Sequence, residues 1–282
     1  MLFRSVDTAE DREYGRGRRG DELPAELARR ESRLTRIRTA KAALAQAATA
    51  AAEQAAEVAR AKVAAREHRV GSAKGSVPKV PDPAQAQPTP DAQYNFTDPD
   101  SRIMLESATK SFAQAYNAQA VVDEHAQVIV ACAVTQQAAD VEQFVPMMEQ
   151  VVQAAGQGPT VLTADAGYFS DANLTAPVVS AVDVYVPPDR VKHRGASPDA
   201  PPRIRSPLAV DMREKLATPA GQEIYRRRKV IVEPVFGQIK EIRGFRRFAF
   251  RGALKVAAEW QLICLTHNLL KLFGARATLA PA

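Results

Sequence analysis

Three acidic residues stand where a carboxylate could carry chemistry. Asp98 follows the β-prone run YNFT, Asp165 closes the apolar run TVLTAD, and Glu233 lies in VIVEPVFGQIK among basic residues. Acids at strand ends lie where α/β sheets bind their ligands. Carboxylates gathered from separate elements repel one another unless a cation lies between them. Because no Cys or His accompanies these acids, their oxygen ligands favour Mg²⁺ or Mn²⁺.

With two such ions bound, the acids could support phosphoryl transfer. A pair of divalent metals about 3.5–4 Å apart stabilises the attacking and leaving oxygens of a phosphoryl displacement. Each acid also has a structural interpretation, because Asp-Pro commonly starts a turn and Asp165 could simply end a strand. Asp100 is the alternative to Asp98 as the first acid. Asp123 also ends a predicted strand, but its place at a hairpin turn indicates a structural role.

Glu233 lies inside a strongly basic stretch. From Tyr225 to Arg251, nine basic residues face two acids, a net charge of +7, whereas the whole chain carries +6. Apart from this stretch the chain is therefore close to neutral. Phenylalanines alternate with the basic residues, which suits a packed surface that also contacts phosphates. A solvated charged face is the structural alternative.

Composition excludes several other classes of protein. The chain has 282 residues, of which 46% are hydrophobic and 25% charged, which is typical of a soluble protein. It contains no run of 18 apolar residues and no secretory signal pattern at its N-terminus. Cys132 and Cys264 are isolated from each other in sequence, which argues against a disulfide scaffold and favours a reducing cytoplasm.

The first third of the sequence predicts an appendage to a folded domain. Residues 1–20 are polar and predicted to be disordered. Residues 21–70 predict one long Ala-rich helix with a weak seam of Leu27, Leu34, Ile37, Leu44 and Val58. Residues 71–93 hold five prolines and predict an extended linker. We expect the domain boundary in this linker.

From Tyr94 onward the pattern alternates between strands and helices. YNFT predicts a short strand, residues 116–123 and 127–135 a hairpin, and residues 160–165 and 182–188 further strands. The predicted helices are residues 140–155, 171–181 with Ser170 as cap, 207–216, 223–240 and 254–273. This order predicts an α/β domain with a mixed sheet covered by helices.

Three blocks of this region resemble the DDE transposases of bacterial insertion sequences. They are NFTDPDSRIM with AQAYNAQAVVDEHAQVIVACAVT, then VLTADAGYFSDANL, then the segment from IYRRRKVIVEPVFGQIK to HNLLKL. Together they span about residues 94–273. The third block is the most specific, because Lys240 follows Glu233 by the family's seven residues. Tyr225 and Arg228 each lie one residue further from Glu233 than in the family, and Lys229 takes the Arg position in strict register.

The resemblance implies a fold, a mechanism and partners. It implies a retroviral-integrase-like (RNase H-like) catalytic domain over residues 94–273, with residues 274–282 as a tail. Asp98, Asp165 and Glu233 would bind two Mg²⁺ (or Mn²⁺) ions for hydrolysis and strand transfer on double-stranded DNA. The chain would act as a homo-oligomer on nucleoid DNA. The residues expected to contact DNA are Tyr225, Arg228, Lys229, Lys240, Arg243, Arg246 and Arg247.

Departures from the family leave alternatives. The family carries a further N-terminal DNA-binding region, so we hypothesise that this chain is an N-terminally truncated copy. A non-catalytic DNA-binding or regulatory remnant using the basic stretch 225–251 is one alternative, and a nuclease of the same fold that cuts without joining is another. Pro234 predicts that the helix kinks or restarts at Glu233. In an unbroken helix, Lys240 would share a face with Glu233 and could hold a phosphate.

Overall fold

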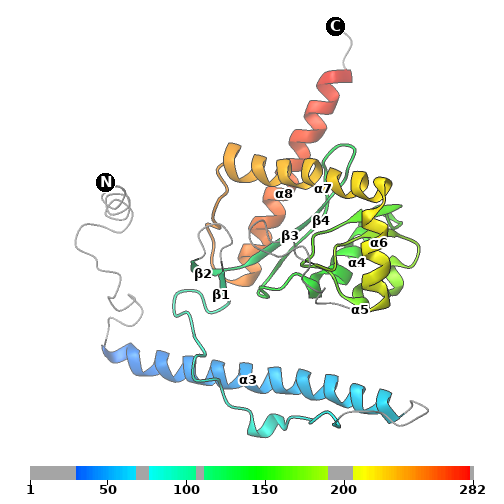
Figure 1. The fold of residues 1–282 in the computed structure, drawn as a ribbon. Helices are drawn as coiled ribbons and strands as arrows, with labels where there is room; N and C mark the ends of the chain where they lie inside the picture. Colours follow the sequence, from blue (N-terminus) through cyan, green and yellow to red (C-terminus); the bar gives the residue numbers. More distant parts are fainter. Residues whose placement is uncertain (1–29, 68–75, 106–110, 190–205, 280–282) are drawn as a thin grey trace, which may run out of the picture. The chain divides into compact units, whose positions relative to one another are not determined.

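The computed structural model describes residues 30–67, 76–105, 111–189 and 206–279 (Figure 1). The chain divides into two compact units, residues 1–99 and residues 100–282. The predicted disorder of residues 1–20 and the predicted start of the long helix lie outside the described residues. No helix among the described residues is both long enough and apolar enough to cross a membrane.

The first unit is built on the long helix α3 (Arg30–Glu67), as the alanine content predicted. Of the predicted seam, Leu34, Ile37 and Val58 are about half exposed in the single chain. The residues that α3 buries are instead Ala40, Ala56 and Ala59. The helix packs on the short 3-10 helix η1 (Pro83–Gln85), which begins inside the proline-rich segment. Small alanine side chains allow such close packing of helix and turn.

The predicted strand at YNFT does not form. The side chain of Asn95 accepts a hydrogen bond from the backbone N of Thr97 at 2.9 Å. An Asn side chain that bonds two residues ahead bends the backbone into a turn, and this local bond replaces the extended conformation. Asp98 therefore follows a turn rather than a strand.

The second unit contains strands in three separate pairs (Figure 1). An antiparallel pair joins β1 (Arg102–Leu105) to β2 (Phe112–Ala115), and a second joins β3 (Asn117–Val122) to β4 (Ile129–Thr135). A parallel pair joins β5 (Val161–Thr163) to β6 (Asp183–Tyr185). The predicted hairpin and the two later strands are confirmed with shorter bounds. Parallel and antiparallel pairs coexist in this α/β unit, but the described strands do not join into one sheet.

Helices cover these strand pairs. They are α4 (Phe144–Ala155), preceded by the 3-10 helix η2 (Val141–Gln143), α5 (Asp171–Leu174), η3 (Pro177–Val179), α6 (Pro207–Ala217), α7 (Pro219–Gly237) and α8 (Ala253–Leu279). Ser170 caps α5 by accepting a bond from the N of Asn173, as predicted. The helix predicted over 171–181 is nevertheless interrupted, because Pro177 cannot continue the bonding pattern of α5.

The helix does not restart at Glu233, which was one of the two predicted effects of Pro234. Helix α7 continues through Pro234 to Gly237 and then widens into a π-helical turn, η4 (Gln238–Ile242). Proline lacks the N–H that would bond to the carbonyl four residues earlier, at Val230. The side chain of Gln127 donates to that carbonyl instead, at 2.9 Å. Because Lys240 lies in the wider π turn, its seven-residue step from Glu233 crosses two kinds of helix.

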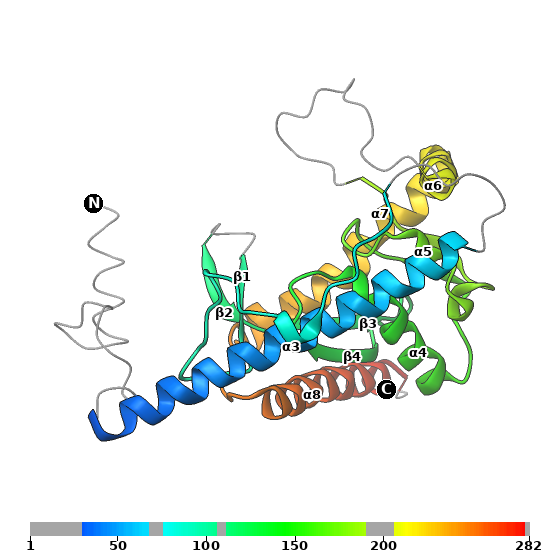
Figure 2. The ribbon, with the colours of Figure 1, turned by 90° about the horizontal axis from the view of Figure 1, so that it is seen from below.

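Two buried clusters hold the unit together. One packs α4 and α6 on β6 through Phe144, Met148, Val184, Val186 and Met212. The other joins the β3–β4 hairpin to α7, η4 and α8 through Ile129, Val235, Ile239, Trp260 and Ile263. Figure 2 shows α8 running beside β4, in agreement with the contacts between them. Helix α7 also contacts β3, β5 and β6, so it is placed by all of these strands.

Candidate active site and nucleic-acid interface

Asp165 lies in a tight turn just beyond the C-terminal end of β5. Its Oδ1 accepts a bond from the N of Gly167 at 2.8 Å, and its carbonyl accepts one from the N of Tyr168 at 3.1 Å. These bonds fix the carboxylate at the edge of a cavity of about 620 Å³. Among the described residues no group donates to Oδ2, so that oxygen remains available to a ligand.

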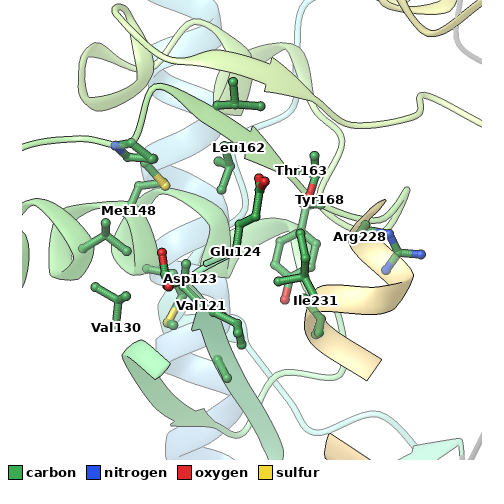
Figure 3. Close-up of a pocket in the computed structure, with 18 of the residues that line it drawn as sticks. Val121, Asp123, Glu124, Val130, Met148, Leu162, Thr163, Tyr168, Arg228 and Ile231 are labelled. Carbon is green, nitrogen blue, oxygen red and sulfur yellow. The ribbon is translucent and has the colours of Figure 1, made fainter. Parts of the chain in front are cut away.

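The cavity separates two of the strand pairs. Consecutive residues from both β3 and β5 line it, over 118–124 and 161–165, together with Val130 of β4. β3 pairs with β4, and β5 pairs with β6. Side chains of α4 and α7 close the cavity, and Figure 3 shows Met148 and Val130 across from Tyr168 and Ile231. Asp165 therefore opens onto a cavity whose walls are mostly apolar.

A buried polar network holds the Asp165 turn against β3. The hydroxyl of Tyr168 donates to Oε1 of Gln119, a side chain that is 3% exposed. Nε2 of Gln119 donates in turn to Asp140 at 2.8 Å, and Asn117 donates to the same carboxylate at 2.7 Å. Burial, together with the nearby charges of Asp140 and Asp165, raises the pKa of Tyr168 well above its usual range. Tyr168 therefore stays protonated and remains a donor.

A second buried side chain supports the same turn. Asn173 is 8% exposed, and its Nδ2 donates to the carbonyl of Tyr168 at 2.8 Å and to that of Val141 at 2.7 Å. Asn173 thereby ties α5 to the turn and to the start of η2. The position of Asp165 is thus fixed by bonds from β3, η2 and α5.

Helix α7 brings Tyr225 and Arg228 close to Asp165. Burial raises the pKa of Tyr225, Arg228 lowers it, and the carboxylate of Asp165 raises it, so Tyr225 interacts electrostatically with both Arg228 and Asp165. The guanidinium of Arg228 lies 5.4 Å from the centroid of the Tyr225 ring. Its Nε is buried and has no hydrogen-bond partner among the described residues. A buried donor left without an acceptor is costly, which suits a position that receives an anionic ligand.

Glu233 lies further along the same helix. Its side chain is exposed, while its neighbours Val232 and Phe236 line the cavity. The N-terminal half of α7 is held to the β3–β4 turn by an ion pair of 2.5 Å between Arg227 and Glu124. Within the described part of the chain, no group of three or more His, Cys, Asp or Glu side chains is arranged to hold a metal ion.

The two candidates for the first acid have different environments. Asp98 belongs to the first unit, and its side chain is buried. Asp100 belongs to the second unit, where its Oδ2 accepts a bond from the N of Ala253 at 2.8 Å, at the start of α8. That carboxylate thus has a structural role at a helix N-terminus. Asp123 accepts a bond from the N of Ala126 at 2.7 Å, which confirms its role in the hairpin turn.

The basic residues expected to contact DNA are not equivalent. Arg243 donates to the carbonyl of Ile263 at 3.1 Å and to Thr266, so it anchors the chain to α8. Arg246 pairs with Glu241. Lys229 is exposed and has no charged partner among the described residues, and Lys240 is exposed with its Nζ 5.6 Å from the Phe236 ring centroid. The two lysines are therefore better placed than Arg243 to bind phosphate.

Sequence reasoning missed the residues that support Asp165. Gln119, Asp140 and Asn173 carry no motif of their own, and each acts through a partner more than 20 positions away in sequence. A weak signal was present for Gln119, since it is a polar residue flanked by Ala118, Ala120 and two valines in a predicted strand. A buried amide of this kind must find hydrogen-bond partners.

Comparison with known proteins adds one match. Residues 200–273 match a family model described as a transposase DDE domain, a range that contains α6, α7 and most of α8 together with Glu233 and Lys240. No curated protein and no solved structure matches the chain. The resemblance to DDE-type transposases is therefore supported over residues 200–273, where the chain is similar to a transposase DDE domain.

Proposed function

We propose that the chain is a DNA transposase that hydrolyses phosphodiester bonds and transfers strands on double-stranded DNA, as a homo-oligomer with an RNase H-like catalytic domain. One observation carries the proposal. Asp165, at the end of a parallel strand, opens onto a cavity beside Tyr225 and Arg228 of α7, and the same helix carries Glu233 within the family match. Carboxylates at the ends of parallel strands commonly face bound ligands.

The donor set fits a hard divalent cation. Asp98, Asp165 and Glu233 would hold two Mg²⁺ or Mn²⁺ ions, because carboxylate oxygens are the ligands that these ions prefer. Asp165 offers an oxygen to which no described residue donates, and Glu233 is exposed. When bound, the ions would polarise the phosphate and activate the attacking oxygen.

The chain's own residues would bind and position the DNA. Arg228 lines the same cavity as Asp165, and its buried Nε, which has no partner among the described residues, can donate to a non-bridging phosphate oxygen. The Tyr168–Gln119–Asp140 network keeps the Asp165 turn in place, which matters because phosphoryl transfer depends mainly on positioning and charge neutralisation. Lys229 and Lys240 would contact phosphates further along the strand.

Charge-removing substitutions test the proposal. The substrate is DNA that carries the ends of the element encoding the chain, incubated with Mg²⁺ or Mn²⁺. We expect Asp165→Asn and Glu233→Gln each to lower nicking and joining by about 10²-fold or more, since each removes a charged group at the reaction centre. Asp211→Asn on α6 and Glu149→Gln on α4 are matched controls, because both acids are exposed and neither lines the cavity. Unchanged activity in the first two variants would refute the enzyme function.

A non-catalytic DNA-binding protein is the second candidate. It is favoured by the exposed lysines on α7 and η4, Lys229 and Lys240, which can contact DNA phosphates without a metal ion. This function predicts DNA binding that is insensitive to EDTA and to Asp165→Asn, with no cleaved product on a gel. Metal-dependent cleavage without joining would instead indicate a nuclease.

A further inference from the structure

Two cysteines meet where β4 packs on α8. They are the only cysteines of the sequence, Cys132 on the strand and Cys264 on the helix. The thiol of Cys264 donates a hydrogen bond to the sulfur of Cys132. Cys264 is 3% exposed and belongs to the buried cluster that joins the β3–β4 hairpin to α8, and Cys132 packs against the same cluster while remaining partly exposed. The two sulfur atoms are therefore direct neighbours, although they are far apart in sequence.

Hydrogen bonds on both sides of Cys264 hold α8 against the hairpin. Asn268, four residues later and on the same helix face, donates to the carbonyl of Ile129 and accepts from its N, both at 2.8 Å. Trp260, four residues earlier on that face, donates through Nε1 to the carbonyl of Gln119 at 2.9 Å. Cys264 lies midway between these two anchors. The contact between the two thiols is therefore fixed by the packing of the helix on the hairpin.

The two thiols differ in reactivity. The bond from Cys264 lowers the pKa of Cys132 to about 7, so a large part of Cys132 is thiolate at neutral pH. The same bond and burial raise the pKa of Cys264, which stays protonated. An oxidant therefore meets a nucleophile at the more exposed Cys132, with a thiol beside it. An accessible thiolate next to a second thiol is the arrangement found in redox-sensing proteins.

We propose that a peroxide oxidises Cys132 and Cys264 to a reversible disulfide that joins β4 to α8 within one chain. The sulfur of Cys132 attacks one oxygen of hydrogen peroxide, the O–O bond breaks and hydroxide leaves, which gives a sulfenic acid. The sulfur of Cys264 then attacks the sulfenic sulfur, and the displaced hydroxyl leaves as water with the proton of Cys264. The hydroxide of the first step takes up the proton that Cys132 had released. Two thiols and one peroxide thus become one disulfide and two waters, with sulfur oxidised and oxygen reduced.

The first step prepares the second. The charge of the Cys132 thiolate and the bond that it accepts both raise the pKa of Cys264, and oxidation of Cys132 removes both causes. Arg243 acts in the opposite direction and lowers the pKa of Cys264. Its guanidinium is held beside α8 by the carbonyl of Ile263 at 3.1 Å, so it remains in place to favour loss of the Cys264 proton. In a reducing cytoplasm cellular thiols would reduce the bond again, as expected of a transient disulfide.

The test uses the full chain, reduced with dithiothreitol, freed of the reductant and then treated with hydrogen peroxide. We expect the intact mass to fall by two hydrogen atoms, and both cysteines to resist iodoacetamide after unfolding. Mass spectrometry of a digest should show the Cys132 and Cys264 peptides as one linked species, which dithiothreitol separates again. Because the sequence holds no other cysteine, any disulfide within one chain joins these two residues.

Single substitutions separate the two steps. Cys264→Ala should stop at the sulfenic acid of Cys132, which dimedone traps, and should reach it more slowly because the stabilising donor is gone. Cys132→Ala should leave Cys264 as an unreacted thiol. The unsubstituted chain tests the proposal even if a variant fails to fold. Sulfinic acid on Cys132 beside a free Cys264 thiol, two unreacted thiols, or disulfides between two chains would each overturn it, and none of these results bears on the proposed action on DNA.

Discussion

Gln127 supplies the hydrogen bond that Pro234 cannot make. Its Nε2 donates to the carbonyl of Val230, four residues before the proline, at 2.9 Å. The Oε1 of the same side chain accepts a bond from Nζ of Lys271 at 2.7 Å. The backbone carbonyl of Gln127 bonds to Nε2 of His267 at 3.0 Å. One turn residue thus connects the β3–β4 hairpin to both α7 and α8. The bond to Val230 thereby satisfies an α7 carbonyl that Pro234 leaves without its helical partner, three residues before Glu233.

Replacing Gln127 should therefore destabilise the second unit. In Gln127→Ala the carbonyl of Val230 loses its side-chain donor, and the loss of such a bond costs about 1–2 kcal/mol. Urea unfolding followed by circular dichroism measures the change. Gln153→Ala is the control, because Gln153 is exposed on α4 and should change stability by less than about 0.5 kcal/mol. Equal stability of the two variants would show that water replaces Gln127 at no cost.

The raised pKa of Tyr168 leads us to expect that the folded protein loses stability at alkaline pH. Burial and the nearby acids raise its pKa in the folded protein, whereas in the unfolded chain it titrates near its ordinary value of about 10. Above that pH the unfolded state loses the proton and the folded state keeps it, so stability falls as pH rises. Tyr168→Phe removes this part of the pH dependence. Between about pH 8 and 11, the free energy of unfolding should fall less steeply with pH for Tyr168→Phe than for Tyr94→Phe. An equally steep fall in the two variants would contradict the prediction.

The local parts of this fold could be predicted from sequence, and the distant interactions could not. The β3–β4 hairpin follows from two β-prone runs around a short turn, and Ser170 follows from the cap preference of helices. The turn at Asn95 overrode the strand propensity of YNFT through one side-chain bond. The carbonyl that Pro234 leaves without a partner in α7 is bonded by Gln127, more than 100 positions away. No local pattern contains such a partner.

The same distinction holds for the site. Asp165 could be recognised because it ends an apolar strand run, and Glu233 because it lies in a specific block of sequence. Asp100 could be separated from Asp98 only through its bond to Ala253, which the fold creates. Likewise, the sequence predicts Arg243 as a DNA-binding residue, but its guanidinium is bonded to α8. The sequence gives the number of cationic side chains. It does not show which of them are already bonded within the protein and which can bind a ligand.

The exposed lysines should govern how DNA binding depends on salt. Removing one phosphate-binding cation should reduce the slope of log affinity against log salt by about 0.9. Lys229→Gln and Lys240→Gln should each approach this change, whereas Arg246→Gln should have a smaller effect because Arg246 already pairs with Glu241. Lys62→Gln on α3 is the control, outside the family-matched residues. Anisotropy titrations at several salt concentrations measure the slopes, and a larger change for Arg246 than for both lysines would reverse this assignment.

Cys132 on β4 and Cys264 on α8 form an interacting pair of thiols. A hydrogen bond from Cys264 lowers the pKa of Cys132 to about 7, while the same bond and burial raise the pKa of Cys264. We therefore expect Cys132 to be alkylated by iodoacetamide with a midpoint near pH 7 and Cys264 to resist alkylation, because the thiolate is the reactive form. In Cys264→Ala the midpoint for Cys132 should move upward by about one pH unit or more, since the stabilising donor is gone. Mass spectrometry of the alkylated peptides measures both sites, and a midpoint for Cys132 that is unchanged in Cys264→Ala would show that the two thiols do not interact.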